Sequence, residues 1–387
     1  MKNYFKFSSV LSGQMNKKIL VIASVLKPVN DSRNYEKTAI SISKSGNYQI
    51  HLVGQKVLNI PTDSSILFNP LFSFSRLSVK RFFTSWIFLN YLFRTKPDLI
   101  IVTTFELLLP SILYKILKSK KLIYDIQENY FRNLIYTNSF PFGIKHILAI
   151  GVRALEYGTR PFVNHYLLAE KNYQKEFSFT KNKHTILENK LLKSSVKPRM
   201  KRQDDCIQLL YTGTIAENYG VFEAVELTKN LYKLDSKIRL KIIGFAAQKT
   251  VLEKLKNEIQ NLDFITITGG ETFVPHQEIL TAIAEADFGL ISYRPDKSTE
   301  NCIPTKIYEY LAHKLPYLIS PNPIWLELTS KYNAGITIDF LNYNADKILE
   351  QLRETKFYTS EAGEEVYWVE DSYWLSEKSS AVRPFYS

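Results

Sequence analysis

The feature that most constrains the fold is an alternation of short apolar runs with amphipathic stretches, which occurs in two series along the chain. Such runs, when they are almost uninterrupted and separated by helical stretches, are typical of parallel strands in a sheet covered on both faces. The sequence therefore predicts an α/β protein with two doubly wound, Rossmann-like domains. Strands are expected at 17–24, 48–54, 98–104, 121–126 and 165–169, then at 207–213, 239–244, 264–268, 287–293, 316–320 and 335–339; helices are expected at 34–46, 77–95, 106–119 and 143–160, then at 219–233, 249–260, 276–286, 303–313 and 343–353.

A change in composition marks the boundary between the two series. The stretch KLLKSSVKPRMKRQDD, residues 190–205, is rich in Lys and Ser, contains Pro198 and lacks periodicity, which is typical of a linker. Two such domains predict a cleft between the carboxyl ends of their strands, where open α/β sheets bind ligands. We predict an N-terminal extension at 1–16, a first domain at 17–190, a linker at 191–205, a second domain at 206–356 and a helical tail at 357–387 that packs on the first domain.

Charge is distributed unequally between the two halves of the chain, whose overall net charge is +12. Residues 1–205 carry 32 basic and 13 acidic side chains, a net charge of +19, whereas residues 206–387 carry 18 and 25, a net charge of −7. The basic half is compatible with an anionic membrane surface, with nucleic acid, or with a solvated surface that has no specific partner. No nucleic-acid-binding motif accompanies it, so no nucleic-acid partner is expected.

Other classes of protein are disfavoured by simple counts. No apolar run reaches the roughly 18 residues of a membrane span, and the first residues lack the apolar centre of a signal peptide. The two cysteines, Cys206 and Cys302, predict neither a disulfide framework nor a metal cluster. A cytoplasmic protein is expected, with peripheral attachment to the inner face of the cell membrane as a further hypothesis.

The segment SYRPDKSTENCIPTKIYEYLAHKLPYLIS, residues 292–320, carries the most chemical information. A helix is expected to begin around Ile303–Pro304, and a helix N-terminus that faces a ligand favours phosphate through its free amides and dipole. Lys306 in the first turn adds a positive charge. Glu309, one turn further, can accept hydrogen bonds from both hydroxyls of a ribose. The segment therefore predicts a nucleotide site.

The same segment resembles a known family. The run P-T-K-I-Y-E-Y-L-A followed by K-L-P is similar to the donor-site signature of glycosyltransferase family 4, the group 1 glycosyltransferases, which have the two-domain GT-B fold. Further segments resemble motifs of this family in their order along the chain. They are Asp31-Ser-Arg33, Tyr124-Asp125-Ile126-Gln127-Glu128-Asn129, Leu187-Glu188-Asn189, Tyr211-Thr212-Gly213-Thr214 and Tyr219-Gly220.

The resemblance implies transfer of a sugar from a nucleotide-diphosphate donor, with retention of configuration and without a metal or cofactor. It implies that the second domain binds the nucleotide sugar and the first binds a glycan or lipid-linked acceptor, in the synthesis of cell-surface polysaccharide, lipopolysaccharide or glycoprotein glycan. The roles it implies are catalytic for Glu309, Lys306 and Glu128, donor-binding for Gly213, Thr214, Tyr219, Arg294, Asn301, Pro304 and Thr305, and acceptor-side for Asp31, Arg33 and Asp125.

Three positions depart from the family pattern. Asn301 stands eight residues before Glu309, where the family has a second glutamate. Thr214 and Tyr219 stand where it has basic residues, and Gln127 stands in place of a common histidine. Compensating positive charge is expected from Arg294, Lys306 or Arg33.

Simpler and rival interpretations remain open at this point. Glu309, Lys306 and Arg294 can be ordinary surface groups, Glu128 can cap a segment, and His276 can cap a helix or contact a base. The chain can also be a nucleotide-sugar epimerase of the same architecture or a non-catalytic binding partner that retains the fold. The aromatic and basic stretches 77–94 and 141–160 are either buried helices or a patch that docks on anionic lipid.

Overall fold

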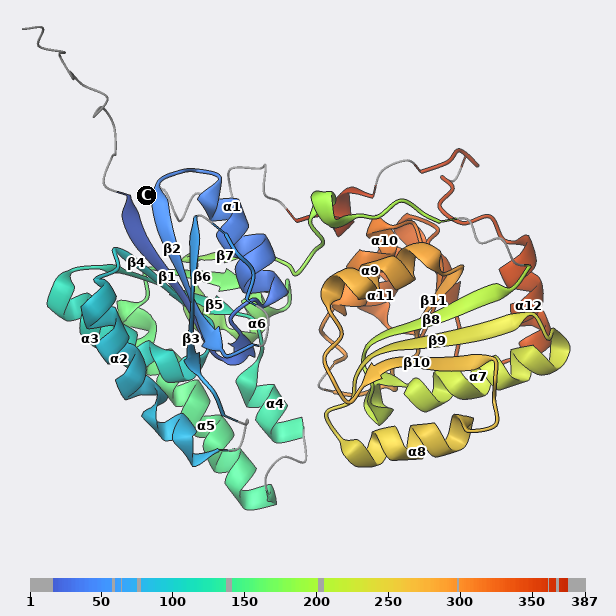
Figure 1. The fold of residues 1–387 in the computed structure, drawn as a ribbon, viewed down its shortest axis with the longest axis horizontal. Helices are drawn as coiled ribbons and strands as arrows, with labels where there is room; N and C mark the ends of the chain where they lie inside the picture. Colours follow the sequence, from blue (N-terminus) through green and yellow to red (C-terminus); the bar gives the residue numbers. More distant parts are fainter. Residues whose placement is uncertain are drawn as a thin grey trace, which may run out of the picture. The chain divides into compact units, whose positions relative to one another are not determined.

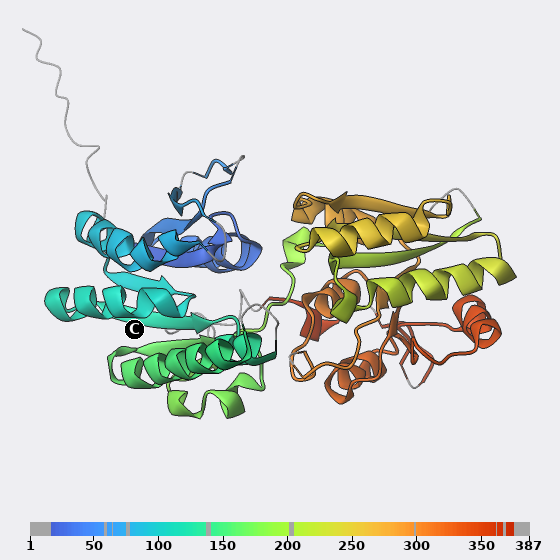
Figure 2. The same ribbon diagram turned by 90° about the horizontal axis from the view of Figure 1, so that it is seen from below.

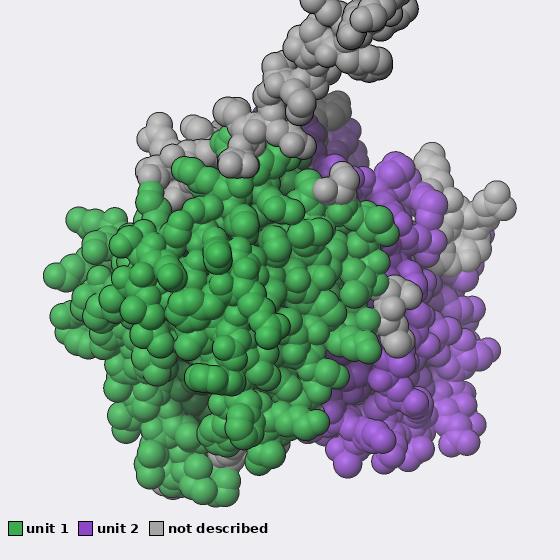
Figure 3. Space-filling view, turned by 60° about the vertical axis from the view of Figure 1, so that its left-hand side comes forward, with its two compact units in different colours: residues 1–187, 376–387 green, residues 188–375 purple. Residues whose placement is uncertain are grey.

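The computed structural model describes residues 17–57, 60–63, 65–74, 78–136, 141–200, 205–297, 299–360, 362–366 and 369–374. The predicted extension at 1–16 and the end of the tail lie outside the described residues. The chain forms two compact units, residues 1–187 with 376–387 and residues 188–375, which Figure 3 colours separately.

The first unit is built on a seven-stranded parallel sheet in the order β3-β2-β1-β4-β5-β6-β7 (Figure 1). Its strands are β1 (Lys18–Pro28), β2 (Tyr48–Gln55), β3 (Ile66–Phe72), β4 (Leu99–Val102), β5 (Lys121–Ile126), β6 (His165–Leu168) and β7 (His184–Ile186). Its helices are the π-helix η1 (Ser32–Ala39), α1 (Ile40–Ser43), α2 (Thr84–Thr95), α3 (Leu108–Lys118), α4 (Tyr130–Tyr136), α5 (Phe142–Thr159) and α6 (Tyr173–Glu176), with 3-10 turns η2 (Val79–Phe83), η3 (Phe105–Leu107), η4 (Arg160–Phe162) and η5 (Ser178–Thr180).

The second unit has a six-stranded parallel sheet in the order β10-β9-β8-β11-β12-β13. Its strands are β8 (Ile207–Thr214), β9 (Ile238–Phe245), β10 (Ile265–Gly270), β11 (Phe288–Ile291), β12 (Tyr317–Ile319) and β13 (Gly335–Thr337). Its helices are α7 (Val221–Leu234), α8 (Lys249–Ile259), α9 (His276–Glu285), α10 (Thr305–Ala312), α11 (Pro323–Lys331) and α12 (Ala345–Glu354), with 3-10 turns η6 (Lys193–Ser195), η7 (Glu217–Tyr219) and η8 (Glu370–Ser372).

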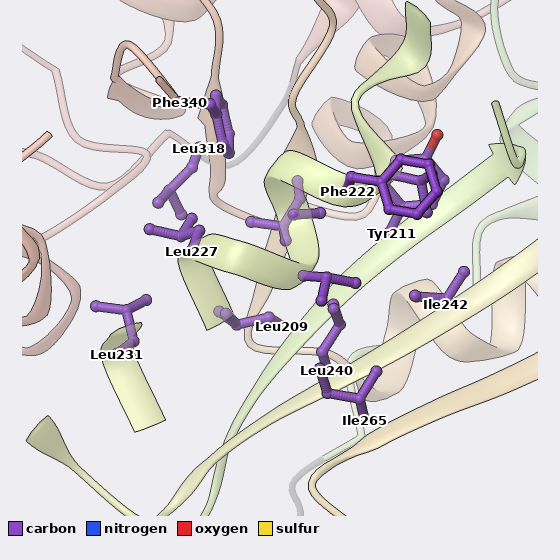
Figure 4. Close-up of a cluster of buried hydrophobic side chains, with 14 of the residues drawn as sticks. Leu209, Tyr211, Phe222, Leu227, Leu231, Leu240, Ile242, Ile265, Leu318 and Phe340 are labelled. Atoms are coloured by element: carbon purple, nitrogen blue, oxygen red, sulfur yellow. The ribbon is translucent and has the colours of Figure 1, made fainter. Parts of the chain in front are cut away.

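Side chains that alternate along β8 fill the cores on the two faces of the second sheet. Leu209 and Tyr211 belong to the cluster under α7, α8 and α12 (Figure 4), whereas Leu210 belongs to the cluster under α9, α10 and α11. Because helices cover both faces, the strand can be apolar throughout. The prediction of two doubly wound parallel α/β domains is confirmed.

The sequence analysis missed five strands and α-helices, namely β3, β7, α4, α6 and α11, and their composition or length explains why; α6 has only four residues. β3 contains Pro70, which a parallel strand tolerates at a sheet edge, and β7 is only three residues long. α4 is a single short helix. α11 begins at Pro323 after the cap Asn322, whose side chain accepts from two backbone amides, a clear helix start that the analysis did not use.

The described part of the tail does not form the expected helix; its end, 375–387, lies outside the described residues, so packing of the tail's end on the first domain stays a prediction. The described part, within 357–374, holds only η8, because positive φ angles at Tyr358 and Gly363 interrupt a helical path. It packs on the second unit, where Leu191 forms a bridge with Tyr373. The segment predicted as a linker is likewise held on this unit as far as Met200, whose N–H donates to Ala284 O at 3.0 Å.

Candidate functional site

The second sheet changes its direction of winding between β8 and β11. The chain leaves β8 toward β9 and β10 on one side and returns to β11, β12 and β13 on the other. Ligands of open α/β sheets bind at such a switch point, outside the carboxyl ends of the strands. The ends of β8 and β11 therefore define where a site is expected in this unit.

The turn after β8 depends on glycine at three positions. Gly213 has φ 94° and Gly220 has φ 73°, a region that residues with a Cβ rarely adopt. A Cβ on Gly244 would lie 1.6 Å from Gly213 O, and one on Gly220 would lie 1.6 Å from Ser292 O. The glycines thus let the backbone of this turn pass directly against β9 and the end of β11.

Lys306 lies in the first turn of α10 and reaches this glycine turn. Its Nζ lies 4.6 Å from the centre of the Tyr211 ring and 5.0 Å from that of Tyr293, and its Cε would lie 3.9 Å from a Cβ on Gly213. The residue is buried, and among the described residues Nζ has no hydrogen-bond partner. Burial lowers the pKa of Lys306 to about 7, although nearby Glu309 opposes the shift.

A buried ammonium without a hydrogen-bond acceptor is costly, so its position requires an explanation. Here it accompanies the free amides at the start of α10, for which Pro304 provides no side-chain cap. A helix N-terminus and a lysine together form a strong site for an anion. The arrangement fits a phosphate group at the turn after β8.

Glu309 lies one turn further along α10 and is paired. Its Oε1 is 2.8 Å from Nε2 of His276, the first residue of α9, and the Glu309 side chain is buried. The pair brings together two residues 33 positions apart, which spacing along the sequence does not reveal. His276 therefore contacts Glu309, the residue expected to bind a ribose. Neither of the two interpretations of this histidine, a helix cap or a contact with a base, includes this pairing.

Aromatic side chains hold the loop that leads from β11 to α10. Tyr219 stacks on Tyr293 with ring centres 4.7 Å apart, and Tyr293 meets the edge of Trp325 in α11. The Trp325 indole donates to Cys302 O at 2.7 Å, and the Asn322 amide donates to Glu300 O at 2.9 Å. The loop that carries Asn301 is thus fixed by α11.

The other predicted donor residues have more ordinary surroundings. Arg294 forms an ion pair with buried Glu223, so its charge is already compensated. Thr305 accepts a hydrogen bond from the Asn189 amide at 3.1 Å, and Thr214 is exposed at the end of β8. Lys306 is therefore better placed than Arg294 to supply charge to a phosphate.

The predicted acceptor-side residues come together in the first unit. Arg33 forms two hydrogen bonds with Asp125, at 2.8 and 3.1 Å, and donates to Leu187 O. Both side chains of the pair are buried, so the Arg33 charge is directed at Asp125, which favours a positioning role over the expected contact with a diphosphate. Asp31 caps η1 by accepting from the amides of Arg33 and Asn34.

Gln127 and Glu128 follow β5 at the carboxyl edge of the first sheet. The Gln127 amide donates to Asp125 Oδ2 at 2.7 Å and to Asn34 Oδ1 at 2.8 Å, and the Lys27 ammonium donates to Gln127 Oε1. Glu128, half-buried, accepts from the Asn133 amide of α4 at 3.1 Å. Glu128 is thus held beside the start of α4, and its catalytic role stays a prediction.

Two absences concern only the described part of the chain. There, no group of three or more His, Cys, Asp or Glu side chains is placed to hold a metal ion. Within the same residues, no helix is both long and apolar enough to cross a bilayer.

Comparison with known proteins gives similarity in structure only. No protein-family model matches the sequence, and no curated protein is similar to it. A sucrose-phosphate synthase of Thermosynechococcus elongatus is similar over 87% of this chain and 90% of its own, with a TM-score of 0.64 and 12% identity. Anabaena HepE, in complex with UDP and glucose, is similar over 95% of this chain and 94% of its own, with a TM-score of 0.58 and 11% identity. The catalytic domain of starch synthase IV from Arabidopsis thaliana, bound to ADP and acarbose, is similar over 88% of this chain and 93% of its own, with a TM-score of 0.58 and 9% identity. The chain therefore has the two-domain GT-B fold.

Proposed function

We propose that this protein is a retaining glycosyltransferase, related to family 4, that transfers a sugar from a nucleotide-diphosphate donor to a glycan or lipid-linked acceptor. The observation that carries the proposal is Lys306, a buried ammonium without a hydrogen-bond partner among the described residues, at the uncapped start of α10. The sequence signature P-T-K-I-Y-E-Y-L-A coincides with this helix. The similarity to HepE, whose structure holds UDP and glucose, supports the same assignment.

In this proposal the donor diphosphate lies against the glycine turn after β8 and the start of α10. The charge of Lys306 and the amides around Thr305 stabilise the diphosphate as it departs, which is the main electrostatic demand of the reaction. Glu309, oriented by His276, accepts hydrogen bonds from the ribose hydroxyls. We propose that the Asn301 side chain forms a hydrogen bond with the donor sugar.

The first unit is proposed to bind the acceptor at the carboxyl edge of its sheet. Gln127, Glu128 and Lys27 present polar groups there, and the buried pair of Arg33 and Asp125 fixes the backbone that carries them. We further propose that the reaction needs no metal, since Lys306 and the helix N-terminus supply the charge. The proposed setting is the synthesis of cell-surface glycans on the cytoplasmic side of the membrane.

The first experiment is a thermal-stability screen with UDP, GDP, ADP, dTDP and CMP, each with and without magnesium. A nucleotide that binds the folded state stabilises it by about 2.7 kcal/mol when its concentration is 100 times Kd. We expect one base to be preferred without magnesium, and the shift to be much smaller in Lys306→Met and Glu309→Ala. Lys331→Met, which changes an exposed lysine of the same unit, is the matched control.

Turnover then separates the proposal from its rivals. The corresponding nucleotide sugar is incubated with a candidate acceptor, and the anomeric configuration of the product is read by NMR. Epimerisation of the donor without acceptor would assign the chain to the epimerases instead. Nucleotide binding with neither transfer nor hydrolysis would identify a non-catalytic binding protein, and failure of every nucleotide to bind would refute the donor site.

A further inference from the structure

Apolar side chains are exposed along the outer faces of three helices in the first unit. α2 contacts α3 and α3 contacts α5, and Figures 1 and 2 show the three side by side on one face of the sheet. Of the 22 large apolar side chains that are exposed in the described chain, 14 lie on η2, α2, α3 and α5. Such concentration exceeds the scattered exposure that is normal for a soluble surface.

The first stripe runs along η2 and the start of α2. It consists of Val79, Phe82, Phe83, Trp86 and Ile87, which follow the spacing i, i+3, i+4, i+7 and i+8 of one helical face. Phe82 is 87% exposed and Trp86 is 66% exposed. The opposite side of α2 is also apolar and packs Phe88 into the core. Residues 79–87 thus expose an apolar face that the core of the unit does not cover.

The second stripe is on α3, which sequence analysis did not single out. Leu109, Leu113, Ile116 and Leu117 are exposed at i, i+4, i+7 and i+8, while Leu108 and Ile112 fill the core. A surface helix ordinarily places polar residues on its outer face. Here that face is aliphatic, so it continues the surface formed by α2.

The third stripe is on α5. Ile144, Ile147, Leu148 and Ile150 are exposed in its first half, and Ile147 is 72% exposed. Ala149 and Val152 are buried on the other side. In the first half of α5, the side that faces solvent is therefore apolar, like the side that packs in the core.

The charges of these helices are almost all positive. Lys80, Arg94, Lys118 and Lys145 belong to η2 and the three helices, and Lys80, Arg94 and Lys118 are exposed. The single acidic side chain in these segments, Glu156, is 1% exposed. An apolar surface with basic charge at its margins fits the boundary between the headgroups and acyl chains of an anionic bilayer.

We propose that this surface, formed by η2, α2, α3 and α5, docks the protein on an anionic lipid bilayer. The stretches 77–94 and 141–160, singled out from the sequence, cover η2, α2 and α5, and α3 completes the surface; Leu77 lies outside the described residues. Aromatic and aliphatic side chains insert among the lipids, while Lys80, Arg94 and Lys118 contact the anionic headgroups. The inference does not depend on the proposed transfer activity.

The position of the stripes agrees with a lipid-linked substrate. In a parallel sheet the crossover helices begin at the carboxyl ends of the strands, and η2, Leu109 and Ile144 all lie near the starts of their helices. The docking surface therefore extends to the sheet edge that carries Gln127 and Glu128. A second copy of the chain is a poorer occupant, because a twofold contact through this face would oppose basic side chains.

The test is co-sedimentation of the full chain with vesicles of phosphatidylcholine alone or mixed with phosphatidylglycerol, without donor or acceptor. We expect binding to the anionic vesicles that weakens with added salt. The variant Phe82→Ser/Phe83→Ser/Trp86→Ser should lower the partition coefficient by at least about tenfold. The control, Phe273→Ser/Leu341→Ser, removes two large side chains of the second unit that are also mostly exposed, and this variant should bind as the parent does.

Two further measurements keep the test decisive. Ile147→Ser/Ile150→Ser on α5 should weaken binding independently, and thermal unfolding should be little changed in each variant because the replaced side chains are exposed. Equal binding by the α2 variant and the control would overturn the proposal. It would also be overturned by a dimer that the α2 variant dissociates, measured by light scattering, in a protein that binds no vesicles.

Discussion

His276 opens α9, Glu309 lies one turn into the next helix, α10, and the two side chains lie 2.8 Å apart, Nε2 to Oε1. The contact orients the Glu309 carboxylate, which we propose accepts hydrogen bonds from the ribose hydroxyls. Hydrogen bonds to a charged group contribute about 1.5–3 kcal/mol. The parent should therefore bind the preferred nucleoside diphosphate more than about tenfold tighter than its 2′,3′-dideoxy analogue, and Glu309→Ala should abolish that preference.

His276→Ala should reduce the same preference only in part, because Glu309 then keeps its charge but loses its orientation. Calorimetric titration of both ligands into the two single variants and the double variant measures the coupling. An undiminished preference for ribose in Glu309→Ala would remove this residue from the nucleotide site.

Proton uptake should accompany binding of the diphosphate. The pKa of Lys306 is lowered to about 7 by burial, and an anion beside Nζ favours the charged form, so binding raises this pKa. At pH 8 we expect up to about one proton to be taken up per nucleotide, since most of the free amine is neutral there. Calorimetry in buffers of different ionisation enthalpy measures the uptake, and Lys306→Met should eliminate it.

Lys306 should also make stability depend on pH in the absence of ligand. The unfolded chain binds this proton up to its ordinary pKa of 10.5, whereas the folded chain loses it near 7. Between these values the unfolded state binds more protons, so the free energy of unfolding should rise with pH. Denaturant titrations from pH 7 to 10 should show a smaller rise in Lys306→Met; equal slopes for the two proteins would refute the assignment.

The glycine turn after β8 should be intolerant of a single methyl group. A Cβ on Gly244 would overlap Gly213 O at 1.6 Å, so Gly244→Ala should separate β9 from β8 and destabilise the fold by about 1–3 kcal/mol or more. In contrast, Gly151 in α5 has open space around its Cβ position, and Gly151→Ala should stabilise the helix by up to about 1 kcal/mol. Urea unfolding of both variants provides the comparison.

The buried pair in the first unit should be worth more to stability than a surface pair. Arg33→Met leaves Asp125 buried without its charged partner and should cost about 3–5 kcal/mol. Lys237→Met removes an exposed pair with Asp205 and should cost less than about 1 kcal/mol. A similar small loss for both variants, measured by urea unfolding, would show that Arg33 is dispensable for the fold.

The amino-acid sequence by itself determined the two parallel α/β units and most of their elements. Apolar runs such as LIIV in β4 and FGLI in β11 are buried completely, and that requires helices on both faces of a sheet. The start of α10 was also predictable, because Pro304, Lys306 and Glu309 are neighbours in the chain. A local sequence pattern is sufficient to predict these elements because their physical causes, apolar periodicity and a helix start, are themselves local.

Only the tertiary structure decided which charges are compensated and which are not. Arg33 and Asp125 are 92 positions apart, yet their pairing turns an expected ligand contact into a buried ion pair. Lys306 Nζ has no hydrogen-bond partner among the described residues because it lies over the rings of Tyr211 in β8 and Tyr293 in the loop after β11. The desolvation that sets its pKa, and the exposure of the stripe on α3, both arise from packing among distant segments, which no local pattern encodes.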